Sequence, residues 1–307
     1  MMKQNYRKTI DFHADDFGVS KHSCDDIFCL IKKHYIDSLS ILPNMSSFSY
    51  ATDLLNSLER KDIDNLNITV HLNFMEGHCC SSLEQIPALV DKKGLFKISW
   101  GKLFIYNYLP FIRNKIKKQL TLEIISQTQK VIDSGILQGK ELRFDGHQHT
   151  HMIPVVFEAL LNAVKYFEQK DFKTEYIRNT QDPLKPYFKE KTIKKSYNKI
   201  NLIKCLILNF YSIKIRKALI KIQLPVNYLC GVFFSGFMDY ERLIKVLLQY
   251  QQLAQMHSQK IELLFHPGTV LAEEITEEFV KPGFNIFHLS EGRKIEYTAI
   301  EKFNENQ

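Results

Sequence analysis

The sequence lacks the local motifs of several common classes of protein. It contains no G-x-S-x-G motif of a serine hydrolase, no G-x-G-x-x-G motif after a predicted strand and no G-x-x-x-x-G-K-S/T phosphate-binding loop. Its six cysteines form no C-x-x-C pair, and they do not alternate with histidines at the spacing of a structural zinc site. Nucleic-acid-binding modules are also absent, so we do not expect a nucleic-acid partner.

Long apolar runs are missing as well. No run approaches the roughly 20 residues that a membrane-spanning helix needs, so we expect no transmembrane segment. The first residues, MMKQNYRKTIDF, lack the apolar stretch of a signal peptide. We therefore expect a chain in the reducing cytoplasm, with most cysteines packed as small apolar side chains.

The overall composition is that of a globular protein, with 45% hydrophobic and 24% charged residues in 307 positions. The formal net charge of +7 predicts mild attraction to anionic partners. Most of this excess lies in residues 185–221, where eleven Lys or Arg accompany a single acid, Glu190. The rest of the chain is nearly balanced, so the positive charge is a local feature.

Four apolar segments share one design: KTIDFHADDFG, NITVHLNF, KELRFDGHQHTH and KIELLFHPG. Each is rich in β-branched or aromatic residues in its first half, which favours a strand, and each delivers His or Asp at its carboxyl end. Helical periodicity separates them, for example in residues 24–36, 154–170 and 240–259. The alternation predicts an α/β protein with a parallel sheet, either a β/α barrel or an open sheet. Because the four segments span residues 8 to 268, we expect a single domain over residues 1–307.

Two stretches, residues 92–118 and 181–225, are interpreted as insertions. The second is basic and amphipathic, with apolar positions at Leu202, Ile203, Leu206, Ile207, Phe210, Ile213 and Leu219. One interpretation is a helical pair that packs this apolar side on the body and leaves its lysines in water. The other is a cap over the site that attracts an anionic substrate or a membrane surface.

The stretch FDGHQHTHMIP places His147, His149 and His151 at alternate positions. If the segment is extended, the three imidazoles share one face, because side chains two apart in a strand point the same way. Neutral imidazole is the commonest metal ligand in proteins and shuttles protons near neutral pH. Together with Asp145, this spacing favours a metal or proton-transfer site over a solvated strand end.

The other segments supply partners for such a site. Two carboxylates, Asp15 and Asp16, follow the first predicted strand; metal-assisted hydrolysis uses one carboxylate as ligand and another as proton acceptor. His71 and His147 complete an Asp–His–His set, which leaves open positions on the ion and is typical of a catalytic centre. His266 precedes Pro267–Gly268, a turn that we expect to hold its imidazole at the mouth of the sheet.

The motifs ADDFG, HLN, D-x-H-x-H-x-H and HPG, in this order, resemble those of the YdjC-like family of carbohydrate deacetylases. The resemblance covers about residues 8–295. It implies a distorted TIM-like (β/α) barrel, here with a basic helical insertion at about residues 181–225. It also implies removal of an acetyl group from an N-acetylated sugar at a divalent metal ion.

By the same resemblance, Asp16, His71 and His147 correspond to the metal ligands, Asp15 to the catalytic base and His266 to the catalytic acid. The sequence departs from the family pattern at two positions. His13 stands where the family usually has Asn, and Val70 stands where Gly often precedes HLN. Both positions flank the site, so they bear on the identity of the substrate more than on the chemistry.

Further residues are expected to support the ligands or contact substrate. We expect Asp145 to hold His147, as carboxylates behind metal-bound histidines do. Arg178 either contacts substrate or forms a surface ion pair. The remaining candidates for these supporting roles are His149, His151, Asn73 and His13.

Two imidazoles and one carboxylate favour one Zn²⁺ or a similar transition ion, while the family resemblance allows Mg²⁺. The alternatives are a metal-dependent phosphoesterase, which would need two or three ions, and a non-catalytic barrel that binds a sugar or lipid. The basic segment favours an N-acetylated sugar on an anionic or lipid carrier. Either a monomer or a homodimer is compatible with the sequence.

Overall fold

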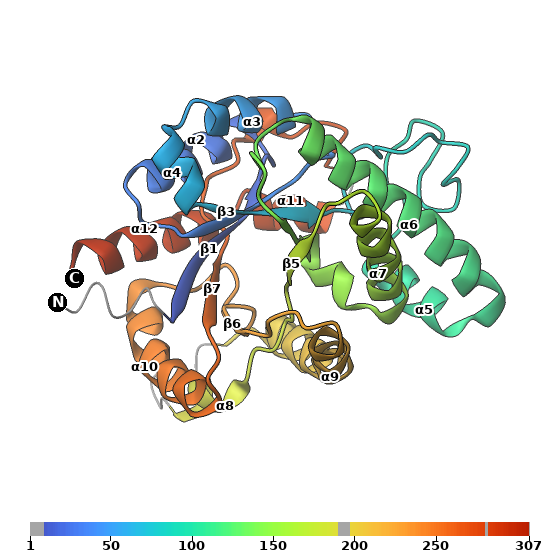
Figure 1. Ribbon diagram of the computed structural model, residues 1–307. Helices are drawn as coiled ribbons and strands as arrows, with labels where there is room; N and C mark the ends of the chain where they lie inside the picture. The colour runs from blue at the N-terminus through green and yellow to red at the C-terminus, as the bar shows by residue number, and fades with distance from the viewer. Residues whose placement is uncertain (1–8, 190–196, 280–281, 307) are drawn as a thin grey trace.

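A seven-stranded parallel sheet forms the centre of the computed structural model, which describes residues 9–189, 197–279 and 282–306. The strand order is β5-β4-β3-β2-β1-β7-β6. Figure 1 shows that the sheet curls into a half-barrel, which confirms the predicted distorted TIM-like α/β architecture. The strands are β1 (Ile10–Phe17), β2 (Ser38–Ile41), β3 (Asn67–Leu72), β4 (Leu142–Gly146), β5 (Thr174–Ile177), β6 (Tyr228–Cys230) and β7 (Ile261–Phe265).

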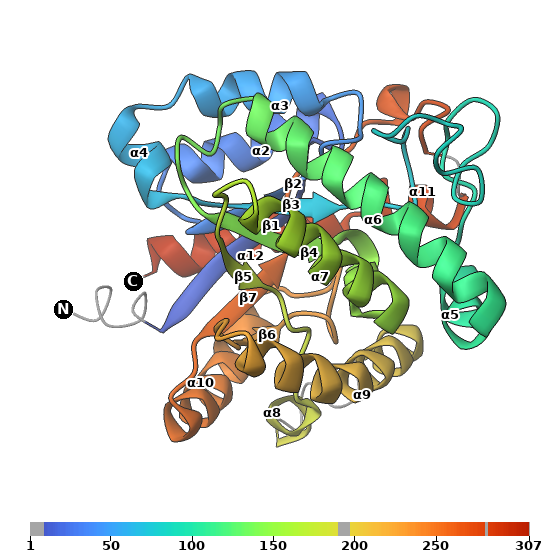
Figure 2. The ribbon, with the colours of Figure 1, turned by 45° about the vertical axis from the view of Figure 1, so that its right-hand side comes forward.

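Most of the helices, among them α2, α3, α6, α7, α10 and α12, lie around the outside of the curled sheet, as Figures 1 and 2 show. Among them, α6 and α7 pack closely on one another, and α10 packs on α12. None of the described helices is long and apolar enough to cross a membrane. The helices are α2 (Lys21–Lys32), α3 (Phe48–Asn56), α4 (Arg60–Asn65), α5 (Trp100–Tyr108), α6 (Pro110–Asp133), α7 (Pro154–Glu168), α8 (Leu184–Lys189), α9 (Lys199–Lys221), α10 (Tyr240–His257), α11 (Pro282–His288) and α12 (Gly292–Glu305), with short 3₁₀ helices η1 (His147–Met152) and η2 (Ala272–Glu274).

The four segments that were predicted as strands form β1, β3, β4 and β7. Strand β7 is buried along its whole length, as expected for a parallel strand that is covered on both faces. The helical predictions match α2, α7 and α10. Helix α2 ends at Lys32, before the predicted end at residue 36, because His34 adopts a left-handed conformation with φ 55° that a helix does not continue.

The first insertion, residues 92–118, contains α5 and the beginning of α6, and the second contains α8 and α9. Residues 190–196 of the basic segment, with three of its lysines and Glu190, lie outside the described residues. Helix α9 packs on the body through a different side from the one that was predicted from its apolar positions. It buries Cys205, Leu208, Tyr211, Ile215 and Leu219, whereas Ile203, Leu206, Phe210 and Ile213 are exposed. The expected packing of these four residues on the body is therefore wrong, because the helix is apolar on two opposite sides.

Asp182 attaches the second insertion to the sheet. Its buried carboxylate accepts hydrogen bonds from the hydroxyls of Tyr187 and Tyr250 and from the backbone N–H of Phe233. Its backbone N–H donates to the Asn209 side chain of α9 at 3.0 Å, and its carbonyl accepts from the same amide at 2.7 Å. Burial outweighs these hydrogen bonds and raises the pKa of Asp182 to about 6.

We predict that Asp182→Asn changes the pH dependence of stability. Because the folded-state pKa is raised from 3.8 to about 6, the protonated carboxyl contributes stability that is present below pH 3.8 and lost as the pH rises through 6. The difference in unfolding free energy between variant and wild type should therefore shift in favour of the variant by about 3 kcal/mol across this range. Urea denaturation at a series of pH values measures it, and a difference independent of pH would contradict the assignment.

Candidate active site

A bulge in β1 brings two consecutive carboxylates into one buried network. His13 and Ala14 pair with consecutive residues of β2, but the register then shifts before Phe17, and Asp16 has φ 67°. In a regular strand adjacent side chains point to opposite faces, whereas a bulge redirects one of them. Asp15 and Asp16 are therefore both buried inside the curled sheet. The sequence predicts that the two carboxylates converge at a turn after the strand, whereas in the structure they converge within the strand, at the bulge.

The structure brings Asp16, His71 and His147, the three residues predicted as ligands, together as a candidate metal group. The Asp16 Oδ1 atom lies 2.9 Å from His147 Nδ1 and 3.4 Å from His71 Nε2. One ligand atom from each residue lies within 4.8 Å of the other two, and all three side chains are buried. Two imidazole nitrogens and one carboxylate oxygen that converge in this way fit a transition ion such as Zn²⁺.

Asp145 holds His71 and not His147, so this part of the prediction is wrong. His71 and Asp145 are register partners on the adjacent strands β3 and β4, and the Asp145 Oδ1 atom lies 2.6 Å from His71 Nδ1. Burial lowers the pKa of His71, but the charges of Asp145 and Asp15 outweigh it and raise the pKa to about 10. In the absence of an ion His71 is protonated, so an ion has to displace that proton in order to bind.

The three alternate histidines do not form one row, because residues 147–152 fold into the 3₁₀ helix η1. Gln148 and His149 adopt left-handed conformations with φ 55° and 57°. His147 faces Asp16, whereas His151 donates from Nε2 to the Arg178 carbonyl at 3.0 Å. Burial lowers the pKa of His149 well below its usual value and that of His151 to about 4, so both rings are neutral at neutral pH.

Three residues without a predicted role surround the candidate metal group. Arg293 of α12 donates to Asp16 Oδ2 at 2.5 Å and to His288 Nδ1 at 3.0 Å. Because Nδ1 accepts, Nε2 of His288 carries the proton and donates to Glu76 Oε2 at 2.9 Å. The same Glu76 oxygen lies 3.8 Å from His147 Nε2. Glu76 follows the HLN motif by three residues, so its role could have been predicted from the sequence. Arg293 and His288 belong to no motif.

Arg178 binds the second carboxylate of the bulge, and it is fully buried. Its Nη2 and Nη1 atoms donate to Asp15 Oδ1 and Oδ2 at 2.9 and 3.0 Å. It also lies 2.8 Å from Asp145 Oδ2, and its Nε donates to Glu262 Oε1 at 2.6 Å. The surface ion pair considered from the sequence is excluded by this burial. Burial raises the pKa of Asp15, but Arg178 and His71 outweigh it and hold the pKa well below its usual range.

His13 and Asn73 are both buried beside these groups. His13 Nδ1 lies 2.6 Å from Ser38 Oγ, and its Nε2 lies 2.7 Å from Ser40 Oγ and 3.1 Å from Asp15 Oδ1. Asn73 uses its side-chain oxygen to accept from the backbone N–H groups of the next residues, including Glu76 at 3.1 Å. His13 thus supports Asp15, and Asn73 orders the loop that carries Glu76.

His266 lies at the open side of the site, and its side chain is more exposed than those of Asp15, Asp16, His71 and His147. Its Nε2 atom is 3.9 Å from Asp15 Oδ2, and its Nδ1 atom is 3.5 Å from Glu296 Oε2. The backbone N–H of His266 donates to Glu296 at 2.5 Å. This places an imidazole at the end of β7, as the HPG turn predicts.

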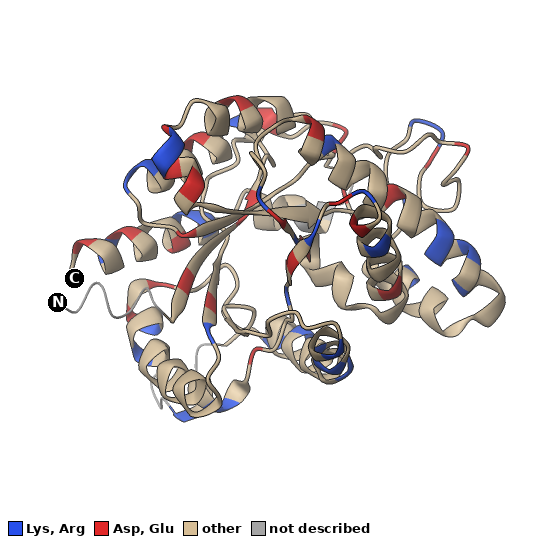
Figure 3. Ribbon diagram, viewed as in Figure 1, with Lys and Arg blue, Asp and Glu red and all other residues tan. Residues whose placement is uncertain are grey.

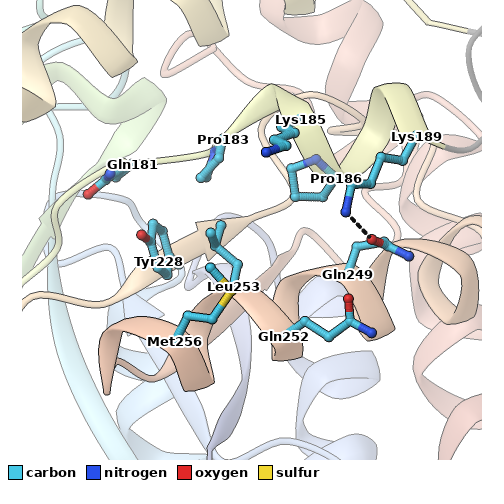
Figure 4. Close-up of a pocket in the computed structure, with 10 residues that line it drawn as sticks. All are labelled: Gln181, Pro183, Lys185, Pro186, Lys189, Tyr228, Gln249, Gln252, Leu253 and Met256. Atoms are coloured by element: carbon cyan, nitrogen blue, oxygen red, sulfur yellow. Dashed lines mark hydrogen bonds between the residues drawn. The ribbon is translucent and has the colours of Figure 1, made fainter.

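Two cavities are relevant to the location of a substrate. One of about 260 Å³ lies where η1 meets α5 and α9, and it is lined by Trp100, Gln148, Ile200, Ile203, Lys204 and Ile207. Gln148 follows the predicted ligand His147 in η1, so this cavity adjoins the candidate site. The other, of about 320 Å³, lies between α8 and α10 (Figure 4) and contains none of the candidate site residues.

Comparisons with known proteins agree with the motifs. The model of the family described as YdjC-like protein matches residues 9–302. A carbohydrate deacetylase of Clostridium beijerinckii is 26% identical over 153 residues, which cover 50% of this chain and 55% of that protein. A carbohydrate deacetylase of Listeria monocytogenes is 29% identical over 128 residues, covering 41% of this chain and 47% of that protein. The chain thus spans about half the length of the curated relatives it matches.

A solved structure shares the fold. The crystal structure of a candidate cellobiose-phosphate cleavage protein of Enterococcus faecalis superposes with a TM-score of 0.52 and 16% sequence identity. The superposition covers 95% of this chain and 94% of that protein. At this identity the likeness concerns the architecture alone.

We predict that Arg178→Gln lowers the free energy of unfolding by about 3–5 kcal/mol, because it leaves buried carboxylates without their shared cation. Arg60→Gln is the control: Arg60 pairs with Asp64 on the surface of α4, and its loss should cost about 0.5 kcal/mol or less. Chemical denaturation of both variants at neutral pH measures the difference. Equal, small losses in the two variants would show that Arg178 does not support the interior.

We predict that retention of a metal ion depends on His71. Wild-type protein should retain one divalent ion per chain after dialysis, whereas His71→Ala should lose it, because two remaining ligands hold such an ion poorly. His257→Ala, which removes an exposed histidine at the end of α10, should retain it. Elemental analysis of the purified proteins provides the test. An unchanged ion content in His71→Ala would rule out this ligand set.

Proposed function

The chain belongs to the YdjC-like protein family, and from this premise we propose that it is a metal-dependent carbohydrate N-deacetylase. It would hydrolyse the acetamide group of an N-acetylated sugar to a free amine and acetate. The observation that carries the proposal is the meeting of a three-residue candidate metal group, a separate carboxylate and an imidazole in one site. The curated relatives are named carbohydrate deacetylases, which supports the removal of an acetyl group from a carbohydrate.

Asp16, His71 and His147 are the residues that would hold the ion. When bound, a divalent ion supplies Lewis-acid polarisation of the acetamide carbonyl and makes the attacking water more acidic. Asp145 fixes the His71 ring, and Arg293 occupies Asp16 Oδ2, so that the other carboxylate oxygen faces the two imidazoles. The ion is Zn²⁺ or Mg²⁺ in our proposal, and the nitrogen-rich donor set favours Zn²⁺.

Asp15 would accept the proton of the attacking water. Because Arg178 and the neighbouring imidazoles outweigh burial and keep the pKa of Asp15 low, the carboxylate is ionised at neutral pH. His266 would then donate a proton to the departing sugar nitrogen, a role that suits imidazole at neutral pH. Both groups border the same space, with 3.9 Å between His266 Nε2 and Asp15 Oδ2.

The cavity beside η1 would receive the sugar and whatever the sugar is attached to. Its lining is apolar except for Gln148 and the cationic Lys204, and Trp100 offers the flat apolar surface on which sugar rings commonly pack. An apolar cavity with one cation suits an N-acetylated sugar on an anionic or lipid carrier better than a free neutral sugar. We place this reaction in the cytoplasm, where a chain of six unpaired cysteines is stable.

A phosphoesterase is the weaker alternative, because it would need at least two ions. Within the described residues, the second candidate group, Glu76–His147–His288, shares His147 with the first. The third group includes Asp15 and Asp145, whose carboxylates already bind the Arg178 guanidinium. A second cation there would be repelled, so the arrangement favours one ion.

The test is acetate release from a panel of N-acetylated sugars, neutral and phosphate-bearing, with and without added divalent ions. We expect release from at least one substrate, and Asp15→Asn should reduce the rate by about 10²–10⁴ while the protein keeps its ion. Asp16→Asn should lose the ion as well. The control is Asp53→Asn, at an exposed position on α3.

The outcomes separate the possible roles. No acetate from any sugar, together with phosphate release from the phosphate-bearing ones, would overturn the deacetylase in favour of the phosphoesterase. Sugar binding without turnover would indicate a non-catalytic barrel. If a neutral chitooligosaccharide is hydrolysed faster than every anionic sugar, a charged carrier is excluded as part of the substrate, but the proposed deacetylation stands.

A further inference from the structure

Helix α9 exposes a row of large apolar side chains on the side that faces away from the body. The row consists of Ile203, Leu206, Phe210, Ile213 and Ile220, and about 64% of Phe210 is accessible to solvent. The opposite side of the same helix packs on the body through Leu208, Tyr211, Ile215 and Leu219. A helix with one exposed apolar side normally turns that side toward another molecule.

Helix α5 and the start of α6 add exposed apolar residues next to this row. Phe111 is 98% exposed and Tyr108 58% exposed, and Ile105 on α5 is also exposed. The two helices are neighbours: the hydroxyl groups of Tyr108 on α5 and Tyr211 on α9 lie 3.2 Å apart. We refer to the exposed apolar residues of 100–112 and 199–222 as the α5–α9 surface.

The charge around the α5–α9 surface is entirely positive in sequence. Residues 100–122 contain five Lys or Arg and residues 199–221 contain six, and neither stretch contains Asp or Glu. Figure 3 shows the blue segments on α9 and on the first half of α6 without red among them. Arg113 and Lys117 pair with Glu158 of α7. Seven of the others are exposed: Lys102, Lys115, Lys118, Lys199, Lys214, Lys217 and Lys221.

We propose that the α5–α9 surface docks on an anionic phospholipid bilayer. Amphipathic helices of this kind place apolar side chains at the boundary of the acyl chains and lysines at the headgroup level. Anionic headgroups attract such lysines, each by about 1 kcal/mol near the surface. A second copy of this chain is a poorer partner for the same surface, because it would bring an identical set of lysines against the first.

Docking in this orientation would have a consequence for the reaction, and this consequence alone rests on the proposed function. The cavity beside η1 shares Ile200 and Ile203 of α9 with the α5–α9 surface, and the half-buried Trp100 of α5 lines it as well. It also contains Gln148, the neighbour of His147 in sequence. A sugar linked to a membrane lipid could therefore reach the candidate metal group while its lipid stays in the bilayer.

Vesicle co-sedimentation of the full chain tests the docking without any substrate. We expect binding to vesicles of phosphatidylcholine mixed with phosphatidylglycerol, little binding to phosphatidylcholine alone, and a loss of binding at high salt, where the screening length falls to about 3 Å. Phe210→Ser/Ile213→Ser should weaken binding by more than about tenfold. Lys214→Gln/Lys217→Gln/Lys221→Gln should weaken it by about fivefold for each lysine.

The matched control is Met256→Ser/Ile286→Ser, which removes two apolar side chains that are at least as exposed, one from α10 and one from α11, and should bind like wild type. All these positions are exposed, so circular dichroism and thermal unfolding should show intact folds. The proposal is overturned if wild type does not sediment with anionic vesicles, or if Phe210→Ser/Ile213→Ser sediments like wild type. A dimer by light scattering that this variant loses, without vesicle binding, would assign the surface to a second copy.

Acetate release is measured separately, so docking and catalysis can fail independently. Vesicle binding by a protein that releases no acetate would leave the docking surface in place and remove the proposed function. Acetate release from soluble sugars by a protein that does not bind vesicles would support the proposed function and overturn the docking surface.

Discussion

The buried guanidinium of Arg178 is the group on which the interior of this protein depends. It follows β5 and binds carboxylates from β4, β1 and β7, namely Asp145, Asp15 and Glu262. Three strands separate β5 from β1 in the sheet, so these contacts are possible only because the sheet curls. Removing charges from water is expensive, and the carboxylates are tolerated there because one rigid, multidentate cation serves all three.

The bulge in β1 gives two adjacent carboxylates different surroundings. Asp15 faces Arg178, which keeps it ionised, whereas Asp16 faces His71 and His147 and gives its second oxygen to Arg293. Asp145 holds the His71 ring at 2.6 Å, whereas the nearest Glu76 oxygen lies 3.8 Å from His147 Nε2 and binds His288. We propose that one carboxylate binds the ion and the other accepts the proton. These separate roles follow from the backbone geometry of the bulge, where Asp16 has a positive φ.

Much of this arrangement could be predicted from the sequence, because it is encoded locally. Strand periodicity and terminal His or Asp residues located β1, β3, β4 and β7 and the residues that meet at their carboxyl ends. The partner of Asp145 was mispredicted because it depends on strand register, which pairs it with His71. Arg293 and His288 come from helices that have no motif and join the site only by packing. The exposed side of α9 escaped prediction because apolar residues on two sides of a helix do not reveal which side is buried.

We infer that Asp16, His71 and His147 hold one ion beside a separately stabilised Asp15. X-ray absorption at the zinc edge, on protein loaded with one equivalent of Zn²⁺, tests it most directly. We expect scattering from two imidazole rings and light oxygen ligands, and the loss of one ring in His147→Ala. A spectrum with sulfur or purely oxygen ligands, or one that His147→Ala leaves unchanged, would contradict it.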